Sequence, residues 1–165
     1  MARTTAEHSK SHVYVGFAGE TGRGRVVHTG LWRMADGANE WQPLSKGLPE
    51  APAIRALAVH PETPEIVYAG TQSGPYRSND RGEHWEKIEL PGHGLPVWSC
   101  LSHPHDCDTI YVGCDSAEIY MSDDAGEHWM RLPVAVRFPE ITTVPTANPA
   151  KRVLMMDASA SDPDL

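Results

Sequence analysis

The chain has 165 residues, which is enough for one domain with a hydrophobic core of its own. Its 22 acidic and 14 basic residues give a net charge of −8, which opposes binding to nucleic acid because that binding needs clustered Lys and Arg. No apolar run approaches the ~20 residues of a membrane helix, so we expect neither a nucleic-acid nor a membrane partner.

The N-terminal residues are small and polar. We expect residues 1–11 to form a flexible leader, because they hold little that can be buried. The stretch also lacks the apolar core of a signal peptide. Three cysteines, Cys100, Cys107 and Cys114, do not suit a disulfide framework, because their number is small and odd. A reduced, cytoplasmic location is therefore expected.

Four kinds of short strand recur along the chain. Strand B is rich in β-branched and aromatic residues and ends on glycine, at residues 12–16, 66–70 and 110–113. Strand C has an aromatic residue two places before its end, at 30–34, 74–78 and 118–122. Strand D follows at 40–44, 84–88 and 128–132. Strand A precedes the later copies of strand B, at 54–61, at 97–104 and, in weaker form, at 141–149.

The connection between strands C and D carries the clearest repeat. Residues 78–85 recur almost unchanged at 122–129, 44 residues later, and in degenerate form at 34–41. The Asp can accept hydrogen bonds from its own turn, the Gly supplies a positive φ, and the Trp covers the turn. We therefore expect a structural turn. Its residues are Asp36 and Trp41; Ser78, Asp80, Gly82 and Trp85; and Ser122, Asp124, Gly126 and Trp129. Met34 and Ala38 replace the Ser and Gly in the first copy, so we expect a looser or reshaped turn there.

The repeat predicts the architecture. A period of about 40–45 residues with four short strands is typical of a β-propeller blade, and no segment shows the apolar spacing of a helical repeat. The predicted fold is all-β, a β-propeller of four-stranded antiparallel blades. Its repeats cover residues 12–157, as 12–45, 53–90, 96–133 and the start of a next blade at 139–157, and 158–165 is expected to be a truncated tail.

About three blades are present, whereas natural propellers have typically four to eight. The blades are therefore expected to form an open arc. Two explanations are open: the chain is a fragment of a longer propeller, or it is a half-ring that closes by pairing with a second copy through its open edges.

The pattern Ser-x-Asp-x-Gly-x-x-Trp, intact twice and degenerate once, resembles the bacterial neuraminidase repeat, or Asp-box, family over about residues 12–157. That family includes sialidases, xyloglucan-degrading hydrolases, the sortilin receptor domain and a photosystem II assembly factor. The resemblance implies a β-propeller in which the box is a structural turn on the rim, away from any active site. It therefore implies a fold and very little chemistry.

Candidate functional residues follow from topology. In a blade, the B–C and D–A connections lie on the face opposite the C–D turns, and loops on a rigid scaffold carry function. The first B–C connection, residues 18–29, is ~10 residues longer than its counterparts and contains Gly-Arg-Gly-Arg. It is either a basic loop for an anionic or sugar ligand or a tolerated insertion. The candidate ligand-binding residues are Glu20, Arg23, Arg25, His28, His93, Trp98 and Asp115.

Motifs for catalysis are weak by comparison. Arg33 and Arg77 occupy the same place in two repeats, so they are better explained as strand C residues than as part of a sialidase arginine trio. The cysteines and nearby histidines suggest a metal, but His103-Pro104 matches His60-Pro61 and so marks the end of strand A. We expect no metal and no cofactor.

The predicted function is a non-catalytic scaffold for binding or assembly, with a protein or glycan ligand on the face opposite the boxes. The alternative is a glycoside hydrolase whose catalytic residues lie partly outside this chain, and no catalytic residue is assigned. Clustered carboxylates with raised pKa values would indicate an enzyme, and an aromatic or apolar face would indicate a scaffold.

Overall fold

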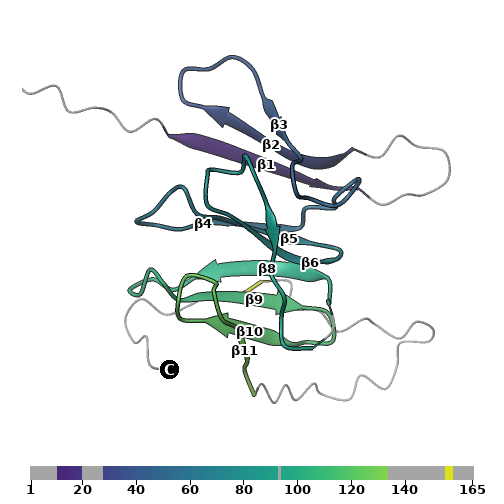
Figure 1. Cartoon of the computed structure of the whole chain (residues 1–165), viewed down its shortest axis with the longest axis vertical. Helices are drawn as coiled ribbons and strands as arrows, with labels where there is room; N and C mark the ends of the chain where they lie inside the picture. The colour runs from purple at the N-terminus through teal and green to yellow at the C-terminus, as the bar shows by residue number, and fades with distance from the viewer. Residues whose placement is uncertain (1–10, 20–27, 93, 134–154, 158–165) are drawn as a thin grey trace, which may run out of the picture.

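The computed structural model describes residues 11–19, 28–92, 94–133 and 155–157. These residues contain eleven β-strands and no helix, and hence no helix that could span a membrane. The strands form three antiparallel sheets stacked on one another (Figure 1). The predicted leader at 1–11, the start of a next blade at 139–157 and the tail at 158–165 lie outside the described residues, apart from residue 11 and residues 155–157.

Strands that are adjacent in the sequence are also adjacent in each sheet. Blade 1 contains β1 (His12–Ala18), β2 (Thr29–Ala35) and β3 (Gln42–Leu44). Blade 2 contains β4 (Ala56–Val59), β5 (Val67–Thr71), β6 (Gly74–Ser78) and β7 (Glu86–Lys87). Blade 3 contains β8 (Val97–Ser102), β9 (Ile110–Cys114), β10 (Ile119–Ser122) and β11 (Met130–Arg131). The order confirms the predicted all-β fold, with B-C-D in blade 1 and A-B-C-D in blades 2 and 3.

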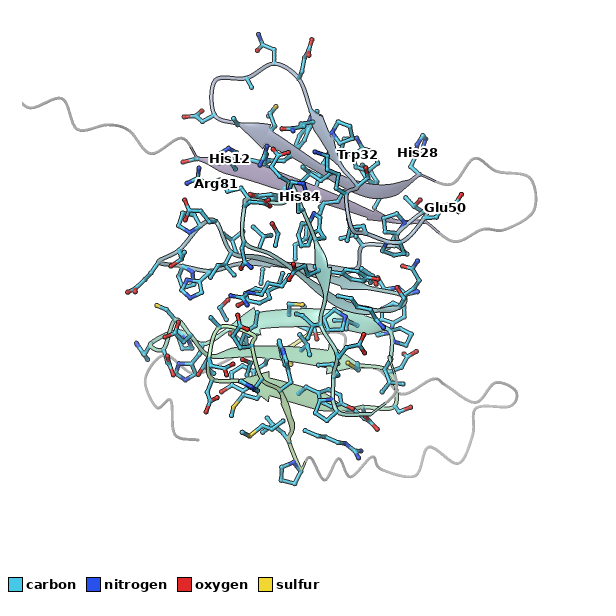
Figure 2. All side chains as sticks on the ribbon, viewed as in Figure 1. His12, His28, Trp32, Glu50, Arg81 and His84 are labelled. Atoms are coloured by element: carbon cyan, nitrogen blue, oxygen red, sulfur yellow. The ribbon has the colours of Figure 1, made fainter. Side chains whose placement is uncertain are left out.

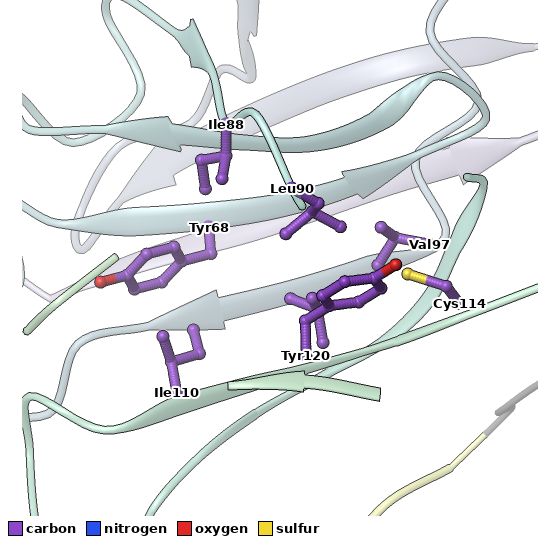
Figure 3. Packing of buried hydrophobic residues seen from close by; sticks show 8 residues of the cluster. Tyr68, Ile88, Leu90, Val97, Ile110, Cys114 and Tyr120 are labelled. Atoms are coloured by element: carbon purple, nitrogen blue, oxygen red, sulfur yellow. The ribbon is translucent and has the colours of Figure 1, made fainter. Parts of the chain in front are cut away.

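The core lies between the blades, because side chains alternate between the two faces of each strand. In β5, Val67 and Ala69 pack toward blade 1, and Tyr68 packs toward blade 3, so the whole strand is buried. The core between blades 1 and 2 contains Leu31, Leu44, Ile54, Val67, Ala69, Tyr76 and Trp85. The core between blades 2 and 3 contains Tyr68, Ile88, Leu90, Val97, Ile110, Val112, Cys114 and Tyr120 (Figure 3).

The glycine at the end of strand B allows the next blade to approach closely. A Cβ atom on Gly16 would lie 2.3 Å from Cγ2 of Ile54, and one on Gly70 would lie 2.6 Å from Cγ1 of Val97. Ile54 and Val97 occupy the same place at the start of successive strands A. The recurrent glycine is therefore needed for packing between blades rather than for an unusual backbone angle.

The box turn, residues 78–85 in blade 2, is held by a closed set of hydrogen bonds. The Ser78 hydroxyl accepts from the Gly82 N–H at 2.7 Å and donates to Asp80 Oδ1 at 2.8 Å. Asp80 Oδ1 also accepts from the His84 N–H at 2.9 Å, and the Trp85 indole donates to the Gly82 carbonyl at 2.9 Å. The box turn of blade 3 makes the same bonds.

The corresponding turn of blade 1 has a different conformation. In the box turn of blade 2, Arg81 and Gly82 both have positive φ, 61° and 91°. In blade 1 only Gly37 does, at 75°. Trp85 is 3% exposed and Trp41 is 43% exposed. Blade 1, with Met34 and Ala38, therefore has a reshaped turn and an uncovered tryptophan.

The box turns of blades 2 and 3 also bind the blade before them. The Tyr14 hydroxyl donates to the Arg81 carbonyl at 3.1 Å, and the Tyr68 hydroxyl donates to the Ala125 carbonyl at 2.6 Å. Beside these bonds lie two ion pairs. They join Arg33 to Glu83, and Arg77 to Glu127. We call this Tyr–carbonyl bond and Arg–Glu pair the interblade latch, and it gives the strand C arginines a structural role.

Removing a box aspartate should destabilise the fold in a pH-dependent way. The His128 N–H, its imidazole and the Ser122 hydroxyl bind Asp124 and hold its pKa at about 2. Asp124→Ala should lower the free energy of unfolding by about 1 kcal/mol near neutral pH, since two backbone N–H groups lose their acceptor. The folded pKa lies below the unfolded value of ~3.9, so this contribution is complete above that value and lost as pH falls toward 2.

Urea unfolding from neutral to acidic pH measures this effect. The difference between wild type and Asp124→Ala should shrink as pH falls. Asp123→Ala is the matched control, because Asp123 is exposed in the same turn and accepts none of these bonds. Equal stability of the two variants at neutral pH would contradict the role of Asp124.

The interblade latch can be tested by removing one oxygen atom. Tyr68→Phe should lower the free energy of unfolding by about 1 kcal/mol, because the half-buried Ala125 carbonyl loses its donor. Tyr76→Phe is the control. Tyr76 is also buried, at 6% exposed, and its hydroxyl has no hydrogen-bond partner among the described residues. If both variants unfold at the same urea concentration, the Tyr68 bond contributes nothing.

Candidate functional site

The two ends of the blades carry different connections. The box turns lie beside the A–B loops, since the Arg81 N–H donates to the Glu65 carbonyl at 2.9 Å and the Ala125 N–H to the Asp108 carbonyl at 2.8 Å. The B–C connections lie at the other end. Figure 2 shows Arg81 and His28 at opposite ends of the stacked sheets. The face predicted to bind a ligand is therefore separated from the box turns by the length of the strands.

The structure describes three of the seven candidate ligand-binding residues. Trp98 and Asp115 lie together, with the indole N–H of Trp98 donating to Asp115 Oδ1 at 2.8 Å. His28 is exposed just before β2. The other candidates, Glu20, Arg23, Arg25 and His93, lie outside the described residues.

A β-bulge positions Trp98. In the pairing of β8 with β9, Val97 is opposite Cys114 and Ser99 is opposite Gly113, so Trp98 is an extra residue in the strand. Bulges of this kind redirect a side chain, and they are frequent beside binding and active sites. β8 contacts β4, so the strands A of blades 2 and 3 lie side by side at this point.

Arg55 stacks on the Trp98 ring. Its guanidinium carbon lies 4.1 Å from the ring centroid, which is a cation–π contact. Nη1 of Arg55 is buried and has no hydrogen-bond partner among the described residues. The ligand-face prediction missed Arg55. Residues 54–55 and 97–98 are the first two of successive strands A, and this alignment could have placed Arg55 beside Trp98.

The B–C turn that carries Asp115 is strained. Ser116 and Ala117 have φ of 64° and 56°, which is costly for residues with a Cβ atom. The Asp115 N–H donates to the Pro96 carbonyl at 3.0 Å, and the Cys114 N–H donates to the Glu118 carbonyl at 2.9 Å. These bonds fix the turn to the loop before β8 and hold the Asp115 carboxylate beside Trp98.

The other chemical groups near this turn have structural partners. Glu118 accepts from the Tyr120 hydroxyl at 2.6 Å and pairs with Arg131 at 3.1 Å, so both carboxylate oxygens are engaged. Burial raises the pKa of the Cys100 and Cys114 thiols to about 12, so both are protonated at neutral pH.

The histidines that suggested a metal are loop caps. Nδ1 of His103 accepts from the N–H groups of His105 and Asp106, at 3.2 and 3.0 Å. Nδ1 of His60 likewise accepts from the N–H of Thr63 at 3.0 Å. Each histidine closes the A–B loop of its own blade. Within the described part of the chain, no group of three His, Cys, Asp or Glu side chains is arranged to hold a metal ion.

The strain in the turn predicts an unusual response to glycine. Ala117→Gly should raise the free energy of unfolding by up to about 1 kcal/mol, because glycine adopts a left-handed conformation without a Cβ penalty. Ala56→Gly, in the regular strand β4, should have the opposite effect. Thermal unfolding of both variants measures this. A lower melting temperature for Ala117→Gly would show that the turn is not strained.

The sequence matches no protein-family model, and no curated protein is detectably similar to it in sequence. The fold is similar to those of solved β-propellers. An ancestral GH74 enzyme matches 62% of this chain and 15% of its own, with a TM-score of 0.55 and 15% identity. The GH74 xyloglucanase from Xanthomonas campestris matches 76% of this chain and 22% of its own, with a TM-score of 0.52 and 22% identity. YCF48 bound to D1 peptide matches 73% of this chain and 36% of its own, with a TM-score of 0.52 and 17% identity. The chain thus spans less than half of each of these proteins, and the likeness shows an open, partial β-propeller fold.

Proposed function

We propose that the chain is a non-catalytic β-propeller scaffold that binds a peptide through Arg55 and Trp98, on the face opposite the box turns. The carrying observation is the stacked pair itself, in which a buried guanidinium N–H of Arg55 has no partner among the described residues. A buried donor without an acceptor is costly. Arg55 is only half-buried as a residue, so a ligand carboxylate, from an acidic side chain or a C-terminus, would pair with its guanidinium.

The chemistry of the site suits a peptide. The planar guanidinium of Arg55 is already oriented by Trp98, and guanidinium groups bind carboxylates through paired N–H donors. The Trp98 ring offers an apolar surface to a side chain next to the carboxylate. Asp115 fixes the ring by accepting its N–H. The cation, the aromatic surface and the anchoring carboxylate come from two adjacent blades.

The overall charge makes this recognition local. A net charge of −8 repels anions at long range. Salt screens that repulsion beyond about 8 Å at physiological ionic strength. A carboxylate in contact with Arg55 therefore depends on the nearby guanidinium more than on the total charge.

One similar structure adds support through the fold. YCF48 was solved bound to D1 peptide, so a propeller of related architecture has a peptide ligand. Identity of 17% supports the fold comparison alone. The location of the ligand on this chain rests on Arg55 and Trp98.

A glycoside hydrolase is the second candidate. It is favoured by the Trp98–Asp115 pair, because an aromatic ring beside a carboxylate is also suited to a sugar, and by two GH74 enzymes among the similar structures. Hydrolysis needs two carboxylates about 5–10 Å apart. Glu118, three residues beyond Asp115, has both oxygens engaged by Tyr120 and Arg131. The scaffold reading therefore agrees better with the geometry.

Peptide binding can be measured on an array of random ten-residue peptides with free or amidated C-termini. Wild-type protein should prefer peptides with free carboxylates, and Arg55→Gln should weaken their binding about tenfold or more. Arg81→Gln, at the opposite end of the blades, is the matched control and should bind like wild type. Equal binding of free and amidated peptides, or unchanged binding by Arg55→Gln, would refute the carboxylate site.

A xyloglucan hydrolysis assay tests the glycoside hydrolase alternative. Incubation with xyloglucan should release no reducing ends. Release that Asp115→Asn abolishes would instead favour a glycoside hydrolase.

A further inference from the structure

The outward face of blade 1 is apolar and uncovered in the described structure. Val13, Phe17 and Trp41 are 53%, 45% and 43% exposed. Val15 and Trp32 lie on the same face, and with Phe17 and Trp41 they line a hollow of about 320 Å³. Monomeric proteins rarely expose large contiguous apolar patches, and such patches often mark interaction sites.

The repeat shows what normally covers such a face. In blade 2, the equivalents of Val13, Phe17 and Trp41 are Val67, Thr71 and Trp85, and they are only 0%, 0% and 3% exposed. Leu31 and Leu44 of blade 1 pack in one core cluster with Val67 and Trp85. The face of blade 1 is therefore shaped to receive the forward face of another blade, meaning the face that each blade turns toward its successor.

No other described blade packs on the forward face of blade 3. Its equivalents of Tyr14, Arg33, Gln42 and Leu44 are Tyr111, Met121, Met130 and Leu132. Met130 is 49% exposed. Methionines thus replace the arginine and the glutamine, so this face is more apolar than the forward face of blade 1.

Charge supports a match between these two faces. Arg33 pairs with Glu83 and Arg77 pairs with Glu127 at the two junctions within the chain. At a junction between blade 3 and blade 1, Met121 takes the arginine position and Asn39 takes the glutamate position. Both members of the pair are uncharged, so contact leaves no unpaired buried charge.

The residues for the Tyr–carbonyl bond of the interblade latch are also present at this junction. Tyr14 and Tyr68 donate to the carbonyls of Arg81 and Ala125. Arg81 and Ala125 are residues with positive φ. Tyr111 is the third tyrosine of this series, and Gly37 is the positive-φ residue in the turn of blade 1. A Tyr111 hydroxyl bonded to the Gly37 carbonyl would reproduce the same contact.

We propose that two copies of this chain dock head to tail, with the outward face of blade 1 of each copy on the forward face of blade 3 of the other. The three described blades of each of two copies give six, which lies within the usual range of closed propellers. Such an interface joins different patches of the two copies, and it ends in a closed ring rather than a filament only when the rotation closes.

Sedimentation equilibrium of the full chain tests the assembly. The expected mass is about twice 18.1 kDa. Trp41→Ala should weaken the dimer at least about tenfold. Val59→Ala is the matched control, because Val59 is 40% exposed but lies on blade 2, and it should leave the dimer unchanged. A wild-type mass of one chain, or an open series of larger masses, would overturn the closed dimer.

A charge swap tests the predicted register. Met121→Arg or Asn39→Glu alone should weaken the dimer about tenfold, because each places an unpaired charge at the junction. The double variant should recover most of the wild-type affinity, since it recreates the Arg–Glu pair of the other junctions. Circular dichroism checks that each variant is folded. Double-variant affinity no better than that of the singles would overturn the register.

Discussion

Successive blades are joined by the interblade latch as well as by the apolar core between them. The backbone carbonyl that accepts from Tyr14 belongs to Arg81, and the one that accepts from Tyr68 belongs to Ala125, in the middle of each box turn. These residues have φ of 61° and 54°, which costs energy for any residue other than glycine. The hydrogen bonds within the box turn stabilise that conformation, so the turn's own structure and the contact between blades depend on each other.

This dependence explains why the box is built from Ser, Asp, Gly and Trp. Ser78 and Asp80 satisfy the N–H groups of the turn, so the Arg81 carbonyl is presented outward. Trp85 binds the turn through its indole and at the same time fills the core against blade 1. A motif with an acid, a hydroxyl and an imidazole therefore has a complete structural explanation in this fold.

The sequence predicted the blades well because their signals are local and repeated. Strand B ends on glycine, strand C holds an aromatic residue, and the box recurs at a constant interval. Contacts between blades were harder to predict. The Arg33–Glu83 pair joins residues 50 positions apart, and Arg33 was assigned only to strand C.

Of the arrangement around Trp98, the sequence predicted which loops share an end of the blades but not the stacking of Arg55 on the ring. Topology predicted that Trp98 and Asp115 lie at the same end of the blades, because strand direction alone decides which loops share an end, and the two side chains do lie together. The stacking of Arg55 on Trp98 depends on a bulge that inserts Trp98 into β8. A bulge needs one extra residue and leaves little trace in a pattern of alternation, so the alignment of residues 54–55 with 97–98 indicates that the two residues are neighbours but not that they stack.

The Arg55–Trp98 pair and the outward face of blade 1 belong to different junctions between blades. Arg55 and Trp98 come from the strands A of blades 2 and 3, whose mutual packing is complete within one chain. Trp41 and Phe17 line the hollow on the outward face of blade 1, and the Phe17 carbonyl accepts from the N–H of Ile54, the residue before Arg55, at 3.1 Å. Loss of self-association would leave the Arg55–Trp98 pair in place, and substitution of Arg55 would leave the face of blade 1 intact. The proposed peptide binding and the proposed ring closure can therefore be tested separately, because they are assigned to different junctions between blades.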